Sequence, residues 1–366
     1  MWDLLYASNG SKQGPEAHPD LGRDGGVQPV EKLLMLVGVF HFPTDYGIDV
    51  GELARELEAR EFDSLFVCEH THIPVSRRTP FPGGGELPKR YSHTHDPFVG
   101  LAFAAAATRT LRLGTGIALV PQRDPIVTAK SVASLDRLSG GRFVFGIGGG
   151  WNAEEMENHG THYGSRFKIL RERVLAMQAL WTQDKAEFHG EFVAFDPVWL
   201  YPKPKQKPYP PILLGGESDH TLRRVVEFGN GWLPRRQREF DPDRAVARLR
   251  QAAAAAGRDP TTFSITVFNA PADEAVLASY RKAGIHRVLL DVPDRGRDEV
   301  LRVLDQNGPL ARVLVGTSGA SIPHRMRRGG LIYRWRGRNA PEWKPIEQRV
   351  PITWATLLFR TVCTGD

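Results

Sequence analysis

The chain has 366 residues, of which 41% are hydrophobic and 25% charged, and it carries a formal net charge of +6. That size allows one large α/β domain with extensions, and two cysteines, Cys68 and Cys363, exclude both a disulfide framework and a paired-cysteine zinc site. Because the sequence has no run of eighteen apolar residues and no basic segment followed by an apolar one at its start, we expect a cytoplasmic protein without a membrane partner.

The first residues differ from the rest of the chain in composition and in hydrophobic pattern. Residues 1–33 are rich in Gly, Pro, Asp and Ser and lack an apolar period, so we expect a poorly ordered extension. From residue 34 onward, apolar runs alternate with amphipathic segments, as in parallel βαβ units. Strands are predicted at 34–42, 64–70, 111–120 and 142–151, with helices at 49–62, 96–110 and 125–141 between them.

The second half continues this alternation after one interruption. A helix is predicted around 165–181, and the next strand of the alternating pattern is expected at 210–218. Between them, a hairpin predicted at 186–195 does not belong to the alternation of strands and helices. Further strands and helices alternate up to Gly308. Eight strands and eight helices in alternation predict an α/β fold of the TIM (β/α)8 barrel type over residues 34–308, with an inserted hairpin and two terminal extensions. A doubly wound open sheet is the alternative, but Trp151 stands where the third glycine of its dinucleotide motif belongs.

The positive charge is concentrated in the tail. Residues 309–366 carry ten Lys and Arg residues against three acidic ones, so the rest of the chain is nearly neutral. Aromatic residues among the arginines of 322–338 would suit stacking on single-stranded nucleic acid. Because this pattern is restricted to the tail, a nucleic-acid partner is the weaker hypothesis.

Reactive groups of a parallel barrel lie beyond the carboxyl ends of its strands. The second predicted strand ends in Glu69 and His70, a pair suited to proton transfer, although an exposed polar strand end would look the same. In the third, Gly114 and Gly116 indicate either a close approach of a ligand or a packing constraint.

The next two strand ends are rich in glycine. After the fourth, Gly149 and Gly150 precede Trp151, which could form a wall beside a planar ligand or pack in the core. After the fifth, residues 215–218 lead directly into a helix, an arrangement that favours an anion such as phosphate but also suits a plain turn.

The loop after the second strand contains two His-x-His pairs. His70, His72, His93 and His95 could in principle bind a metal ion. No cysteine or compact carboxylate cluster completes such a set, so we predict no metal site. The stretch FPGGGELPKRY in this loop is more typical of a lid or a substrate wall.

Taken in order, these strand ends resemble the luciferase-like monooxygenase superfamily, and within it the oxidoreductases that use the deazaflavin coenzyme F420. The resemblance covers 34–308 and rests on GVFHFPT, SLFVCEHTHIP, LRLGTGIALVPQRDPIVTAKSVASLDRLSGGRFVFGIGGGW and PPILLGGESDHTLRRVVEFGNGW. It implies a bulge with a cis peptide at Gly116-Ile117 behind the cofactor ring, and a phosphate at Gly215 and Gly216. The cofactor-binding residues it implies are Thr115, Gly116, Ile117, Gly149, Gly150, Trp151, Gly215, Gly216, Glu217 and Ser218.

The resemblance also implies catalytic roles for His70, as proton donor or acceptor, and for Glu69 beside it. One departure is Trp151, because some relatives carry a catalytic glutamate there; here Glu154 and Glu155 follow a turn later. Arg123, Arg166 and Lys168 are candidates for binding the acidic lactyl-glutamate chain of F420.

We therefore predict hydride transfer between F420 and a small organic substrate, with a homodimer as the assembly suggested by the resemblance. An FMN-dependent monooxygenase is the alternative enzyme. A non-catalytic deazaflavin-binding or nucleic-acid-binding protein is the alternative from another class.

Overall fold

The computed structural model describes residues 35–236 and 240–315. The predicted N-terminal extension, Cys363 and nearly all of the basic tail lie outside the described residues. Among the described helices, none combines the length and the apolar character needed to cross a membrane.

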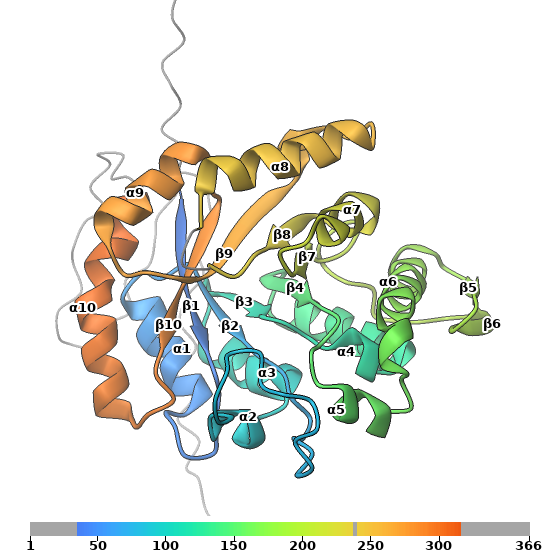
Figure 1. Cartoon of the computed structure of the whole chain (residues 1–366), viewed down its shortest axis with the longest axis horizontal. Helices are drawn as coiled ribbons and strands as arrows, with labels where there is room; N and C mark the ends of the chain where they lie inside the picture. Colours follow the sequence, from blue (N-terminus) through green and yellow to red (C-terminus); the bar gives the residue numbers. More distant parts are fainter. Residues whose placement is uncertain (1–34, 237–239, 316–366) are drawn as a thin grey trace, which may run out of the picture. The chain divides into compact units, whose positions relative to one another are not determined.

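Eight parallel strands close into a barrel, which confirms the predicted fold and excludes the open sheet (Figure 1). Around the barrel the order is β1-β10-β9-β8-β7-β4-β3-β2, so each strand of the alternating pattern pairs with its neighbours along the chain and the last returns to the first. The strands are β1 (Leu36–His41), β2 (Ser64–Val67), β3 (Arg112–Thr115), β4 (Phe143–Ile147), β7 (Ile212–Gly215), β8 (Gly231–Leu233), β9 (Ser264–Ala270) and β10 (Arg287–Val292).

Helices follow the strands and surround the barrel (Figure 1). Asp49, Asp96 and Asp124 begin three of them, each accepting hydrogen bonds from first-turn N–H groups with its carboxylate. The helices are α1 (Val50–Ala59), α2 (Arg90–His93), α3 (Pro97–Ala107), α4 (Pro125–Leu138), α5 (Ala153–Asn158), α6 (Arg166–Thr182), α7 (Asp219–Phe228), α8 (Pro242–Ala255), α9 (Glu274–Ala283) and α10 (Arg297–Val315), with short 3₁₀ turns η1 (Val120–Gln122), η2 (Tyr163–Ser165) and η3 (Pro260–Thr262).

The inserted hairpin is present where the sequence predicts it. It consists of β5 (Ala186–His189) and β6 (Ala194–Val198), which pair antiparallel outside the barrel sheet between α6 and β7. The strands β2, β3 and β4, by contrast, are shorter than predicted. Residues 68–70, 116–120 and 148–151 lie beyond these strands, so the residues singled out for chemistry sit on the loops at the strand ends.

Helix α10 continues past the predicted domain boundary. It runs through Gly308 and Pro309 to Val315, and Ala311 is buried. Burial of this last part against the barrel outweighs the local helix-breaking preference of Gly and Pro. The boundary predicted at residue 308 therefore falls inside α10.

The barrel interior explains two of the glycines. A Cβ atom on Gly114 would lie 2.4 Å from the Phe66 ring, and one on Gly146 would lie 2.0 Å from the Thr115 carbonyl oxygen. Both positions thus lack space for any side chain. Gly114 is a packing glycine, which decides between the two interpretations that its sequence context left open.

Candidate functional site

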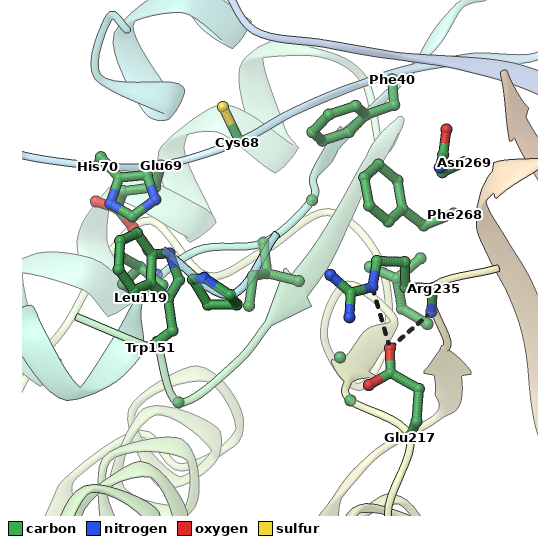
Figure 2. Close-up of a pocket in the computed structure, with 18 of the residues that line it drawn as sticks. Phe40, Cys68, Glu69, His70, Leu119, Trp151, Glu217, Arg235, Phe268 and Asn269 are labelled. Carbon is green, nitrogen blue, oxygen red and sulfur yellow. Dashed lines mark hydrogen bonds and ion pairs between the residues drawn. The ribbon is translucent and has the colours of Figure 1, made fainter. Parts of the chain in front are cut away.

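A cavity of about 730 Å³ opens at the carboxyl ends of the strands (Figure 2). Every barrel strand contributes to it, either with its last residues or with those just beyond. Phe40, Phe268 and Asp291 enter from strands that the sequence analysis did not connect with the site. A volume of this size accommodates a drug-sized ligand or a planar cofactor.

Most of the residues predicted for the site line this one cavity. Thr115 is the exception: it is fully buried, and its hydroxyl donates to the Gly146 carbonyl oxygen at 2.7 Å. The predicted residues along the cavity wall are Glu69, His70, Gly116, Ile117, Gly149, Gly150, Trp151, Gly215, Gly216, Glu217 and Ser218.

The bulge after β3 has the geometry that the resemblance implied. The peptide bond between Gly116 and Ile117 is cis. Backbone hydrogen bonds hold both sides of the bulge. The Gly116 N–H donates to the Val67 carbonyl oxygen at 2.7 Å, and the Ala118 N–H donates to the Gly146 carbonyl oxygen at 2.8 Å. The Ile117 side chain fills the space that a Cβ on Gly148 would need, since that Cβ would lie 2.0 Å from Cδ1 of Ile117.

His70 is held by a carboxylate that the sequence analysis did not pair with it. Its Nδ1 lies 2.8 Å from Oε2 of Glu155, whose side chain is fully buried. The other oxygen, Oε1, accepts the Thr71 N–H at 3.0 Å. Asn152 caps α5 and accepts the Glu155 N–H at 3.2 Å, which fixes the start of this helix. In the sequence, the only indication that Glu155 reaches the site is the helix cap Asn152, which directly follows the glycine-rich end of β4.

Glu69 has a different environment from His70. Its Oε2 accepts a hydrogen bond from the Leu119 N–H at 2.6 Å. Its Oε1 accepts one from the Nε–H group of Arg123 at 2.5 Å. The carboxylate therefore ties the end of β2 to the loop after β3 at the cavity wall. Arg123 is paired with Glu69 and with Asp96, so two carboxylates already neutralise its charge.

On the side of the cavity opposite His70 lies the turn between β7 and α7, from which Glu217 projects (Figure 2). Gly216 has a φ of +119°, and a Cβ there would lie 2.8 Å from Oγ1 of Thr221. The Trp232 indole N–H donates to the Gly216 carbonyl at 2.6 Å, and Ser218 caps α7. Because the two glycines of this turn line the cavity just before α7, no side chain of theirs separates the backbone from a ligand in the cavity.

Arg235, which the sequence analysis did not single out, also lines this side of the cavity. Its N–H donates to Oε1 of Glu217 at 3.1 Å, and its guanidinium lies 4.0 Å from the same oxygen (Figure 2). The charge of Glu217 is thus partly balanced within the site.

Two arginines flank Phe167, which lines the cavity. The guanidinium groups of Arg166 and Arg224 lie 4.4 Å and 3.9 Å from the centre of the Phe167 ring. Neither forms a salt bridge with a carboxylate among the residues that the structure describes. Burial lowers the pKa of Arg224, and the charges of Arg166 and Arg223 lower it further, which together outweigh the opposing charge of Glu227. Lys168 instead pairs with Glu191 at 3.7 Å on the surface.

The loop between β2 and α3 forms part of the wall, as a lid or substrate wall would. Pro82, Arg90 and Tyr91 line the cavity, and the Tyr91 ring lies 5.2 Å from the ring of His70. The histidines of the two His-x-His pairs separate: His93 pairs with Asp45 at 2.9 Å, while His70 faces Glu155.

Fold and site together define a (β/α)8-barrel protein with a large cavity at the carboxyl ends of its strands, a bulged cis peptide on one wall and a glycine turn opposite a buried histidine–carboxylate pair. The chain belongs to the luciferase-like monooxygenase family, which it matches over residues 40–309.

Three known proteins illustrate its relationships. An uncharacterized protein of Mycobacterium tuberculosis is 40% identical over 276 residues, covering 74% of this chain and 97% of the relative. The F420-dependent hydroxymycolic acid dehydrogenase of the same organism is 26% identical over 236 residues, covering 63% of this chain and 64% of its own. The crystal structure of the monooxygenase RslO1 from Streptomyces bottropensis superposes with a TM-score of 0.63 at 21% identity, covering 75% of this chain and 98% of that one. Its likeness concerns the fold.

Proposed function

We propose that this protein is an F420-dependent oxidoreductase that transfers a hydride between the deazaflavin and a small organic substrate. The observation that carries the choice of cofactor is the pair of arginines around Phe167. F420 continues from its phosphate into an acidic lactyl-glutamate chain, whereas FMN ends at the phosphate. Arg166 and Arg224 lie over Phe167, which lines the cavity, and their positive charges are suited to that additional negative charge. The name of the mycobacterial dehydrogenase supports the same choice.

The residues of the site fit a cofactor of this shape. A planar ring would lie against the Gly116-Ile117 bulge, and a phosphate would meet the N–H groups at Gly215 and Gly216, where a Cβ would lie 3.2 Å from Ile117 and 2.8 Å from Thr221. Of the three basic residues that the sequence suggested for binding the lactyl-glutamate chain of F420, we retain Arg166. Arg123 and Lys168 already have carboxylate partners, and Arg224 takes their place.

The chain's own contribution to the reaction is placement and proton transfer. The bound deazaflavin would accept or donate the hydride at its ring. His70 faces the cavity with Nε2, to which no described residue forms a hydrogen bond, while Glu155 holds Nδ1. His70 can therefore take a proton from a substrate hydroxyl, or return it, at Nε2. Trp151 and Tyr91 beside the imidazole limit the access of water.

An FMN-dependent monooxygenase is the second candidate, because the family takes its name from that activity and a monooxygenase shares the fold. Both cofactors would present a ring and one phosphate to the same walls. A binding protein without turnover is a further candidate; a nucleic-acid contact through the basic tail would involve residues outside the described part. A cytoplasmic homodimer stays an expectation.

The test is an anaerobic titration of the protein with F420 and, separately, with FMN, followed by ring absorbance or fluorescence. We expect F420 to bind more tightly than FMN, and its binding to weaken with salt. Arg224→Ala should weaken F420 binding about fivefold, as expected for ~1 kcal/mol of electrostatic attraction, and leave FMN binding nearly unchanged.

Lys168→Ala is the matched control, since its ammonium already pairs with Glu191 on the surface. It should change neither affinity. Tighter binding of FMN, with oxygen consumed once the flavin is reduced, would overturn the proposal and favour the monooxygenase.

A further inference from the structure

The His70–Glu155 pair continues into a chain of hydrogen-bonding groups that leads to the surface. Thr71 approaches Oε1 of Glu155 twice, with its N–H at 3.0 Å and with its hydroxyl at 3.5 Å. The same hydroxyl lies 2.7 Å from Nε2 of His159 and 2.9 Å from Nδ1 of His72. Thr71 and His159 are exposed, whereas Glu155 is fully buried.

Donor and acceptor rules decide which histidine receives the Thr71 proton. The side-chain amide nitrogen of Asn158 lies 2.8 Å from Nε2 of His72. An amide nitrogen can only donate, so Nε2 of His72 accepts and its ring proton sits on Nδ1, from which it donates to Thr71. His72 therefore cannot accept from Thr71 in this arrangement.

The Thr71 hydroxyl has one proton and two remaining partners, His159 at 2.7 Å and Glu155 at 3.5 Å. The shorter contact makes the better hydrogen bond, so Nε2 of His159 is the acceptor. Burial lowers the pKa of His159, which favours the neutral form that can accept at Nε2.

We propose that Glu155, Thr71 and His159 form a proton path that connects His70 in the cavity with solvent. This inference deepens the proposed function, on which it rests, by assigning the route of the proton that accompanies the hydride. Glu155 additionally acts as a positioning residue, because it holds the proton of neutral His70 on Nδ1 and leaves Nε2 free toward the cavity.

Each step of the path breaks one bond to hydrogen and forms another. His70 gains the substrate proton at Nε2 and releases the proton on Nδ1 to Oε2 of Glu155. Rotation of that carboxyl group presents the proton to Oγ1 of Thr71, whose own proton passes to Nε2 of His159. His159, now carrying one additional proton, then releases a proton to water. The contact of 3.5 Å between Thr71 and Glu155 is the longest in the path and must shorten for transfer.

The experiment uses the protein without cofactor or substrate, with ¹⁵N-labelled histidine side chains observed by NMR. His70→Gln identifies the His70 signals. We expect the ¹⁵N shifts of neutral His70 to report a proton on Nδ1. We further expect Thr71→Val to slow the exchange of that proton with water roughly tenfold, since the variant lacks the hydroxyl that links Glu155 to the surface.

Two further variants separate the path from a general effect on the fold. Thr71→Ser keeps the hydroxyl and should restore wild-type exchange, and His159→Gln should slow exchange as Thr71→Val does. An unchanged exchange rate in Thr71→Val, or a proton on Nε2 of His70, would overturn the path. Because no cofactor is present, failure of F420 to bind would refute the proposed function without affecting this result.

Discussion

At the scale of single residues, the site depends on positions where a side chain has no room. Gly216 combines a φ of +119° with a Cβ position 2.8 Å from Oγ1 of Thr221. Both features make any residue other than glycine costly at this position, which lies on the cavity wall. The glycine in the sequence thus reflects a close approach of backbone and cavity.

Gly216→Ala should lower the free energy of unfolding by about 1–3 kcal/mol, because alanine is strained at this φ and meets the Thr221 hydroxyl. Denaturant unfolding measures the change. The matched control is Gly100→Ala in α3, where the new Cβ makes only ordinary contacts at 3.9 Å with Val50. That variant should be as stable as the wild type or more stable. Equal unfolding midpoints for Gly216→Ala and the wild type would show that the turn relaxes freely.

At the scale of elements, one glutamate ties the loop after β2 to helix α5. Glu154 accepts the Thr79 N–H at 3.0 Å and the Ser76 hydroxyl at 3.2 Å. Burial alone would raise the pKa of Glu154, but these hydrogen bonds outweigh it and lower the pKa to about 2 from an ordinary 4.5. Because the folded-state pKa is depressed, the stabilisation is complete above about pH 4.5 and is lost as the pH falls toward 2.

Glu154→Gln should release this loop at neutral pH, because the amide nitrogen that replaces Oε2 cannot accept the hydrogen bond that the Thr79 hydroxyl donates to that oxygen. Limited proteolysis with trypsin should then cleave faster after Arg77 or Arg78. Glu157→Gln is the control, since Glu157 makes only an exposed pair with Arg78 at 3.3 Å. Similar cleavage rates for both variants would mean that Glu154 does not hold the loop.

At the scale of the whole barrel, the last helix completes the packing around β1. Helix α10 contacts both β1 and α9, and Val300, Leu304 and Ala311 are its buried apolar residues. The part beyond Gly308 therefore belongs to the barrel unit. The described residues of α10 end at Val315.

Two truncated chains test this boundary. A chain ending at residue 308 loses Leu310 and the buried Ala311, and should unfold with a free energy about 1–3 kcal/mol lower than the full-length protein. A chain ending at residue 318 should match the full-length protein in denaturant unfolding. Equal stability of both truncated chains would show that the end of α10 contributes nothing, and loss of soluble protein from the longer one would assign a structural role to the tail.

The sequence by itself determined the barrel and part of the wall of its cavity. Alternation of apolar strands with amphipathic helices is a local property, and eight repeats have few ways to bury their strands other than closure. The positions of Gly116, Trp151 and Gly216 followed as well, because residues at the carboxyl ends of parallel strands meet at one end of the barrel. The continuation of α10 past Gly308 did not follow, since local helix-breaking signals there oppose burial that depends on distant elements.

Only the tertiary structure decided how the polar groups pair. His70 and Glu155 are far apart in the chain, and the Glu69–Arg123 and Glu217–Arg235 contacts likewise join separate loops. Such pairings depend on side-chain directions at the end of the closed barrel, which no periodicity encodes. Glu69 and His70 are neighbours in the sequence, yet the carboxylate of Glu69 holds the loop after β3 while His70 faces the cavity. The physical reason is that each side chain takes its partner from a different loop, Glu69 from the loop after β3 and His70 from α5, and barrel closure alone brings these loops together.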